Sequence, residues 1–454
     1  MSNEKISSVK IDSMAAELTS LARDIWEHPE VGYHEYHASK ATADFLKKRG
    51  FDVELGAYNM PTAIRAVWGK GHPVIGFCGE YDALPGLSQK ECSSQSPVSA
   101  GAPGHGCGHN LLGVGCVAAA IGLKAELENS GKEGTVIYYG CPAEELLTGK
   151  PWMAKAGAFK ECDFTFAWHP GSSNQTTVGT FTALEGAKFI FRGRTAHAAG
   201  NPQDGRSALD AVQLMNIGSE FLREHVTDDV RIHYTIRDGG MAPNIVPDYA
   251  VVEYFIRALS REATVDAYNR VKECAYGAAR MTGTEVEIIH TGGCYNTLHN
   301  LTLAEILQKV SRETPLCSWT EEEIKFADEL NHNAPNYYEG AKPIDDRLKP
   351  IAHTNVYGST DYGDVEYICP GIMHSECTSA SLAGSHTWRV TASVGSSMGM
   401  KAMLRAGKIL AAGAYELICS PDLQKKAIDE WKAAKAGKEY VCPIDDSVAY
   451  PYEK

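Results

Sequence analysis

The order of predicted secondary structure is the strongest constraint on the fold, because short β-type runs alternate with helices from residue 52 to residue 168. An amphipathic helix ending near residue 28 precedes them. The predicted strands cover 52–56, 63–68, 74–78, 135–140 and 164–168, and the predicted helices cover 37–48, 110–129 and 151–158. This alternation is typical of a mainly parallel sheet between helices, in which chemistry gathers at the C-terminal strand ends.

The pattern changes between residues 183 and 293, where the predicted order becomes βαββαβ. The strands are predicted at 187–192, 230–236, 249–256 and 285–290, and the helices at 206–224 and 261–281. This is a ferredoxin-like unit, and a chain of 454 residues is long enough for two cores. We therefore expect an α/β catalytic domain from 1–182 plus 294–454, and an inserted domain at 183–293.

The C-terminal part returns to the first domain in this scheme. Helices are predicted near 301–313, 397–419 and 422–435, and 315–354 is interpreted as a long loop with a little helix.

Composition excludes several classes of function. The net charge of −14 disfavours a surface that follows nucleic-acid phosphates. The most apolar stretch, 111–123, is too short to span a membrane, and the first residues lack the apolar core of a signal peptide. Thirteen scattered cysteines do not resemble a disulfide framework. We expect a cytoplasmic protein without nucleic-acid or membrane partners.

The string GHGCGHN at 104–110 is the strongest chemical motif. Its glycines free the backbone, so Cys107 and His109 can point into one small volume. A thiolate and an imidazole suit Zn²⁺ or a neighbouring transition metal. Taken alone, the string also fits a glycine-rich turn with a buried cysteine.

Two further strand ends carry chemical groups. The strand at 135–140 leads to Glu144 and Glu145, and the strand at 164–168 leads to His169. Adjacent side chains leave a strand on opposite faces, which predicts one metal ligand and one general base. A solvated glutamate pair and a core histidine explain each feature singly, but their coincidence at consecutive strand ends favours a metal site.

Ser397 is a competing nucleophile, because GSSMG at 395–399 matches G-x-S-x-G between a strand-like run at 388–394 and a helix. The hydrolase fold with this motif requires a histidine after the serine in the chain. The last histidine is His386, so chain order excludes that triad.

Six strings in order resemble the metallopeptidase family of aminoacylases and indole-acetyl-amino-acid hydrolases. They are GFCGEYDALPG (76–86), GHGCGHN (104–110), CPAEE (141–145), TAHAA (195–199), NIVPD (244–248) and GSHTW (384–388). STDYGDV (359–365) and SHTW resemble the B-type subunits of its p-aminobenzoyl-glutamate hydrolase branch in particular. The resemblance implies a two-metal, exopeptidase-like catalytic domain with an inserted ferredoxin-like lid and dimerisation domain.

The resemblance also implies roles for individual residues. Glu144 would be the general base, and His197 in the lid would reach a partner subunit's active site and stabilise the oxyanion. Asn244 and Arg257 would grip the substrate carboxylate, although Arg257 also fits a salt bridge within the lid. The implied ligands of two divalent ions, Zn²⁺ or Mn²⁺, are Cys107, His109, Glu145, His169 and His386, with the Cys107 thiolate where relatives carry a bridging aspartate.

Two assignments in this region have alternatives. His374 competes with His386 as the last ligand, because it precedes His386 closely in the chain. Glu80 and Asp82 occupy the family's acidic strand-end motif, and we expect them to orient ligands rather than bind metal.

The predicted activity is hydrolysis of the amide bond of an N-acyl or aroyl amino acid, p-aminobenzoyl-glutamate-like, or of a dipeptide with a free carboxylate. We expect a homodimer formed through the lid, with or without a second, related subunit. Two alternatives remain at this point: a non-catalytic, metal-dependent binding protein of the same fold, and a cysteine hydrolase that uses Cys107.

Overall fold

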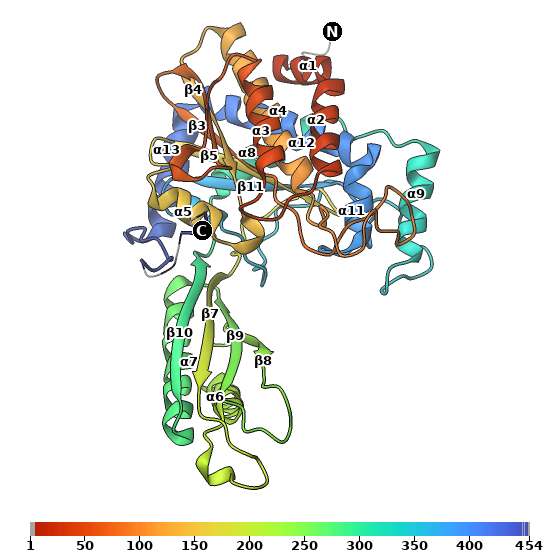
Figure 1. Ribbon diagram of the computed structural model, residues 1–454. Helices are drawn as coiled ribbons and strands as arrows, with labels where there is room; N and C mark the ends of the chain where they lie inside the picture. Colours follow the sequence, from red (N-terminus) through yellow and green to blue (C-terminus); the bar gives the residue numbers. More distant parts are fainter. Residues whose placement is uncertain (1–4, 447, 449, 453–454) are drawn as a thin grey trace.

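The computed structural model describes residues 5–446, 448 and 450–452. Its strands form two sheets (Figure 1). The larger sheet has the order β1 (Asp52–Leu55), β2 (Ile64–Lys70), β4 (Gly134–Cys141), β3 (Val74–Glu80), β5 (Phe164–Gly171), β11 (Gly371–Cys377) and β6 (Gln175–Thr176). The four central strands run parallel, whereas β1, β2 and β6 are antiparallel to their neighbours. The expected α/β class is confirmed, and the sheet is mixed.

Helices cover both faces of this sheet. One face packs against α4 (His109–Ser130), α12 (Ser397–Ile418), α8 (Leu301–Glu313) and α3 (Tyr36–Lys47), the last on β1 and β2. Helices α1 (Ile6–Ser13) and α2 (Ala15–Glu27) pack against α4 from outside. A smaller apolar cluster on the other face includes residues of α5 (Gly149–Lys155) and α10 (Tyr362–Glu366). The remaining helices of this part are α9 (Glu321–His332), α11 (Trp388–Gly395) and α13 (Pro421–Lys435).

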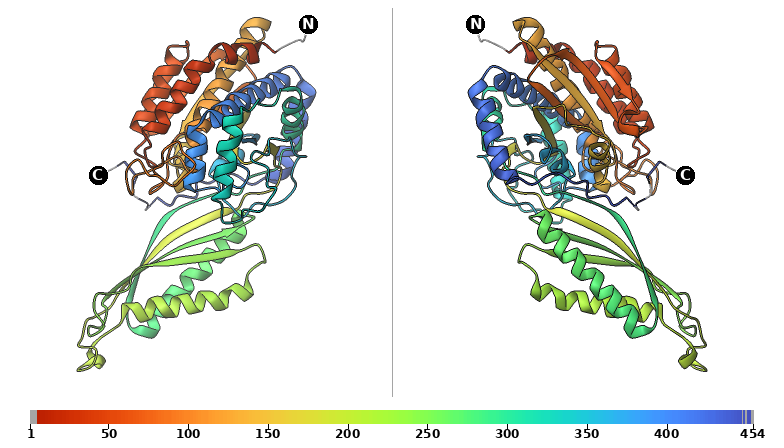
Figure 2. Two further views of the ribbon diagram at one scale, coloured as in Figure 1. Left: turned by 90° about the vertical axis from the view of Figure 1, so that its right-hand side faces the viewer. Right: turned by 90° about the vertical axis from the view of Figure 1, so that its left-hand side faces the viewer.

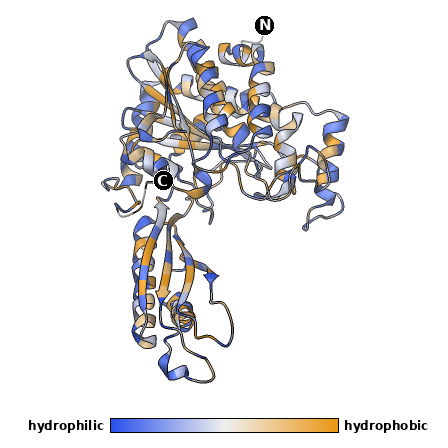
Figure 3. Ribbon diagram, viewed as in Figure 1, coloured by the Kyte–Doolittle hydropathy of each residue, from blue (hydrophilic) through white to orange (hydrophobic). Residues whose placement is uncertain are grey.

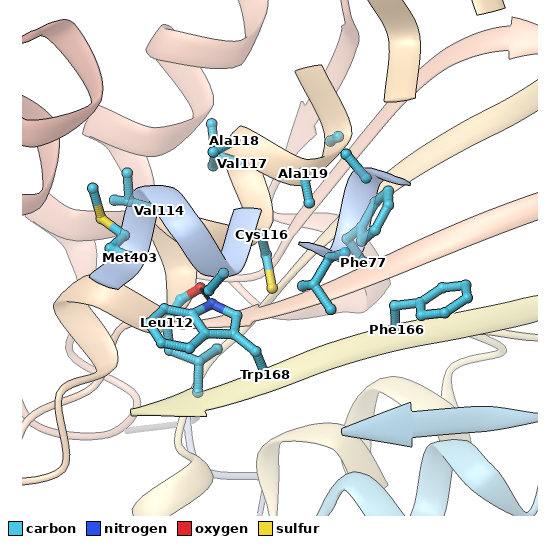
Figure 4. Packing of buried hydrophobic residues seen from close by; sticks show 14 of the residues in the cluster. Phe77, Leu112, Val114, Cys116, Val117, Ala118, Ala119, Phe166, Trp168 and Met403 are labelled. Atoms are coloured by element: carbon cyan, nitrogen blue, oxygen red, sulfur yellow. Dashed lines mark hydrogen bonds between the residues drawn. The ribbon is translucent and has the colours of Figure 1, made fainter. Parts of the chain in front are cut away.

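Helix α4 is the centre of the larger core. It is long and apolar enough to cross a membrane by length and composition, but 94% of its apolar window is buried inside the protein. Trp168 of β5 donates its indole N–H to the Leu112 carbonyl at 3.0 Å (Figure 4). The same indole ring leaves no room for a side chain at Gly115. The apolar side chains of α4 are therefore buried by contacts with the rest of the protein.

The smaller sheet has the order β10 (Glu285–Cys294), β7 (Ala183–Arg192), β9 (Tyr249–Ala258) and β8 (Arg231–Asp238), all antiparallel. Its strands carry apolar stretches (Figure 3). Helices α6 (Ala208–Leu222) and α7 (Arg261–Thr282) lie on the same side of it (Figure 2). We propose that 183–293 is an inserted domain, here called the lid, and that 1–182 plus 294–454 form the catalytic domain.

Several predicted elements differ from the structure. Residues 388–394, predicted as strand-like, form helix α11, because the segment is buried between α2 and α12 despite its β-branched residues. The strand–turn–helix context of GSSMG is therefore absent, and the Ser397 hydroxyl donates to Glu323 at 2.6 Å. Within 315–354, α9 is a regular helix with a capping box made by Thr320 and Glu323. The first helix is interrupted at Met14.

The close approach of β5 to α4 generates a prediction about stability. In Gly115→Ala the new Cβ would lie 2.4 Å from the Trp168 indole nitrogen, so the free energy of unfolding should fall by about 1–3 kcal/mol. Gly277→Ala is the matched control, because nothing lies within 4 Å of that Cβ in helix α7, and it should be neutral or stabilise by up to about 1 kcal/mol. Urea unfolding followed by circular dichroism measures both. Equal effects would contradict the packing argument.

Candidate metal centre

The predicted site residues gather where the parallel strands β3, β4 and β5 end. Asp82 follows β3, His109 opens α4, Glu144 and Glu145 follow β4, and His169 lies in β5. Glu144, Glu145 and His169 line a pocket of about 910 Å³, to which Cys107, the loop before α11 and the base of the lid also contribute. Ligands at the carboxyl ends of parallel strands are the expected arrangement of an α/β fold.

The first group of potential metal ligands is Cys107, His109 and His169, with ligand atoms within 4.8 Å of one another. Gly108 between the first two has φ +83°, a conformation that favours glycine, and it turns the chain into α4. The Nδ1 of His169 is 2.7 Å from the Pro170 carbonyl, and its Nε2 is 3.4 Å from the Cys107 sulfur. A proton on Nδ1 would leave Nε2 with a free lone pair for a metal.

The second group is Cys107, Glu145 and His386, so the thiol belongs to both groups. The backbone N–H of His386 donates to the Gly106 carbonyl at 3.0 Å, which brings this distant loop beside the GHGCGHN segment. His386 has φ +59° and its Nε2 lies 3.5 Å from a Glu145 oxygen.

His374, the alternative last ligand, lies in a different environment. It is fully buried, with Nδ1 2.8 Å from the Thr176 hydroxyl and Nε2 2.8 Å from a Glu376 carboxylate oxygen. Because both ring nitrogens already have partners, His374 has no lone pair to spare, and the geometry favours His386.

The expectation that Glu144 and Glu145 diverge because they end a strand is wrong in its geometry. β4 ends at Cys141, and the two glutamates form a 3₁₀ turn, η2 (Glu144–Leu146), after Ala143 in the left-handed region (φ +54°). The two side chains still separate: Glu145 joins Cys107 and His386, whereas Glu144 joins Glu80 and His109 in a third group.

Asp82 and Glu80 contact the centre from β3. One Asp82 oxygen is 2.8 Å from Nδ1 of His109, and the other accepts the backbone N–H of Glu145 at 2.8 Å. Glu80 lies 3.4 Å from Nε2 of His109 and also accepts a hydrogen bond from the Lys150 ammonium at 2.6 Å. Asp82 therefore orients two potential ligands, and Glu80 lies close enough to be a further candidate.

Burial and mutual charge shift the protonation of the centre. Burial raises the pKa of Cys107 to about 12 and that of Glu145 to about 7. Burial also raises the pKa of Glu144, with a further contribution from Glu80. Burial would lower the pKa of His109, but Cys107 and Asp82 hold it well above its usual range. Carboxylates and a thiol at such close range share protons, unless a bound cation takes the place of those protons.

The residues fit a metal ion on chemical grounds. His109 Nε2 and Glu145 Oε1 are buried polar atoms without a hydrogen-bond partner among the described residues, and both belong to the ligand groups. Such atoms are costly to bury unless something binds them. A thiol, imidazoles and a carboxylate form a donor set suited to Zn²⁺ or a similar divalent ion.

The lid contributes two separate sets of side chains. Arg257 lines the pocket, as do Arg231 and His233, which the sequence analysis missed because an alternating strand pattern does not show which exposed residues face a cleft. Asn244 does not line the pocket with Arg257. It lies beside His197, whose backbone pairs with Ile245.

His197 and Asn244 lie beyond the other end of β9. Arg257 is near the end of that strand and Tyr249 is at its start, so about 26 Å of extended chain separates the two sets. His197 and Asn244 are both exposed, and neither is among the described residues that line the pocket.

Comparisons with known proteins agree with this picture. Residues 76–340 match the model of peptidase family M20/M25/M40. The chain is 37% identical to the B-type subunit of p-aminobenzoyl-glutamate hydrolase of Escherichia coli, with 95% of each chain covered, and 30% identical to human Xaa-Arg dipeptidase, with 96% of this chain and 93% of the relative covered. A dinuclear metal-binding peptidase of Bacillus subtilis shares the fold, with a TM-score of 0.61 and 18% identity over 90% of this chain and 99% of that one.

The shared position of Cys107 generates a prediction about metal content. Cys107→Ala should lose one or both ions, because its thiol belongs to both ligand groups. Cys116→Ala is the control, since this buried thiol in α4 contacts the Cys78 carbonyl and neither group. Elemental analysis after loading with Zn²⁺ or Mn²⁺ and gel filtration gives the stoichiometry. An unchanged metal content in Cys107→Ala would identify the residue as a core side chain.

Proposed function

We propose that the chain cleaves N-acyl or aroyl amino acids, p-aminobenzoyl-glutamate-like compounds, or dipeptides with a free carboxylate. The chain belongs to peptidase family M20/M25/M40 and is a metal-dependent hydrolase of amide bonds. The observation that carries the proposal is the pair of ligand groups sharing Cys107, with Glu144 beside them in one pocket. We infer that the groups hold two divalent ions, Zn²⁺ or Mn²⁺.

Glu144 is the proposed general base. When bound, divalent ions polarise an amide carbonyl and acidify an attacking water. Glu144 takes the proton of that water as its oxygen attacks the carbonyl carbon, and returns it to the leaving nitrogen as the C–N bond breaks. Burial raises the pKa of Glu144, and a more basic carboxylate accepts the proton of the water more readily.

Replacing this base should separate metal binding from turnover. Glu144→Gln keeps the size of the side chain and should retain bound metal while kcat falls by at least ~10²-fold. Glu126→Gln is the control, because Glu126 is equally buried but accepts hydrogen bonds from Ser7 in α1. Metal analysis and kcat are measured on the same preparations. Near wild-type turnover in Glu144→Gln would remove Glu144 from the mechanism.

His197 and Asn244 are proposed to act in the active site of a partner copy. Their position at the far end of the lid keeps them away from their own pocket. Helix α6 and the edge strand β8 expose the apolar side chains Ile217, Phe221 and Ile236, which favours contact with a second copy of the lid. Since the E. coli relative is named as one of two kinds of subunit, a second, related subunit is a further candidate partner.

Subunit complementation tests this arrangement. In a dimer of one Glu144→Ala chain and one His197→Ala chain, one site carries both defects and the other neither. An equal mixture that exchanges freely should therefore regain roughly a quarter of wild-type activity. Native mass spectrometry first verifies the hybrids.

The matched control mixes Glu144→Ala with the double variant Glu144→Ala/His197→Ala, which leaves every site without its base and should stay inactive. If verified hybrids of the two single variants are inactive as well, His197 acts within its own chain or has no catalytic role.

The cysteine-hydrolase alternative is disfavoured. Burial raises the pKa of Cys107 to about 12, so the thiol is protonated at neutral pH, whereas a nucleophilic cysteine needs a depressed pKa. All thirteen cysteines are free thiols, which supports the proposal of a cytoplasmic, reducing environment.

A further inference from the structure

Two arginines of the lid lie opposite each other in the wall of the pocket. Arg231 of β8 is the direct register partner of Arg257 of β9, so both side chains leave the same face of the sheet. Helices α6 and α7 cover the other face of the sheet (Figure 2). Ile232 and Ile256, the residues next to the two arginines in the chain, belong to the apolar core on that face. Both arginines line the pocket that contains the metal centre.

Neither arginine forms a salt bridge with an acidic side chain in the part of the chain that the structure describes. Arg257 donates to the Ser359 hydroxyl at 2.8 Å and to Nε2 of His233 at 3.3 Å, which leaves its second terminal nitrogen free. Arg231 uses one terminal nitrogen for the carbonyls of Asp228 and Val230 and lies over the Tyr357 ring. Each guanidinium therefore retains N–H donors for a ligand.

The pair is unfavourable without a ligand, because a neighbouring carboxylate, Asp229, offsets part of the charge of Arg231 but not that of Arg257. Like charges directly opposite each other on neighbouring strands repel. Burial also lowers the pKa of Arg257, and among the described residues no carboxylate forms a salt bridge with it. One anionic group would satisfy one guanidinium, and two anionic groups on one molecule would satisfy both.

The other charges of the pocket point to the same ligand. Among the described lining residues the only carboxylates are Glu144 and Glu145, and both belong to the metal centre. A basic side chain on the substrate would therefore meet the arginines without an acidic partner. The pocket selects against cations at the lid.

We propose that Arg231 binds a second carboxylate, on the side chain of the leaving amino acid, while Arg257 binds its α-carboxylate. This inference rests on the proposed hydrolysis of N-acyl amino acids and narrows its substrates to those of acidic amino acids. Arg231 is then a specificity-determining residue, outside the reacting atoms. Substrates with a basic leaving amino acid, as in the name of the human relative, are disfavoured.

The test compares p-aminobenzoyl-glutamate with p-aminobenzoyl-glutamine, which has the same shape without the second charge. The metal-loaded wild-type enzyme should prefer the glutamate compound by ~10- to 100-fold in kcat/KM, the range of one charge-assisted hydrogen bond. Arg231→Met should lose that preference by lowering kcat/KM for the glutamate compound alone. Arg231→Lys should restore part of it, because the charge returns without the planar fork.

Arg237→Met is the matched control. Arg237 lies on the same strand but pairs with Glu253 at 2.6 Å and does not line the pocket, so this variant should keep the wild-type preference. A wild-type enzyme that cleaves both compounds equally, or an Arg231→Met variant that weakens both equally, would overturn the inference. If the metal-loaded wild-type enzyme cleaves no N-acyl or aroyl amino acid and no dipeptide, the proposed function itself fails.

Discussion

The Asp82 carboxylate is the contact on which the metal centre depends. One oxygen faces Nδ1 of His109 and the other accepts the Glu145 backbone N–H, so it joins the start of α4 to the turn after β4. Holding Nδ1 aims Nε2 at the ligand groups, and holding the turn fixes which way its two glutamates point. His109 opposes the effect of burial and lowers the pKa of Asp82, so the carboxylate stays charged in the interior.

A second buried contact connects this centre to the substrate side of the pocket. The Lys150 ammonium lies between Glu80, at 2.6 Å, and Asp361, at 2.5 Å. Asp361 belongs to the segment in which Ser359 accepts a hydrogen bond from Arg257. Buried ion pairs contribute little net stability because desolvation offsets their attraction, but they allow few alternative arrangements. Here that restriction fixes the loop that contacts the lid relative to the metal ligands.

Local periodicity explains which parts of the structure could be predicted from the sequence. The lid was predicted strand by strand because its helices and strands are amphipathic, each burying one face in the lid core. Strand β11 was missed because it carries buried polar residues, His374 and Glu376, that are satisfied only by tertiary contacts, including the Arg405 guanidinium. Strand ends and spacing brought Cys107, His109, Glu145 and His169 together as candidate ligands. The preference for His386 over His374 came from the family resemblance, and the three-dimensional partners of each ring support it.

The geometry of the lid explains why its roles were the hardest to predict. A strand of ten residues such as β9 can present one residue to its own pocket and lead to a loop more than 20 Å away. Arg231 and Arg257 lie at the near end, and His197 and Asn244 lie beyond the far end. Sequence spacing cannot distinguish these ends, since alternation gives the face of a residue but not its distance from another domain. A rigid sheet with polar groups at both ends can contribute to one pocket in its own chain and to a second pocket in a partner copy. The length of the strands then determines which pocket each end can reach.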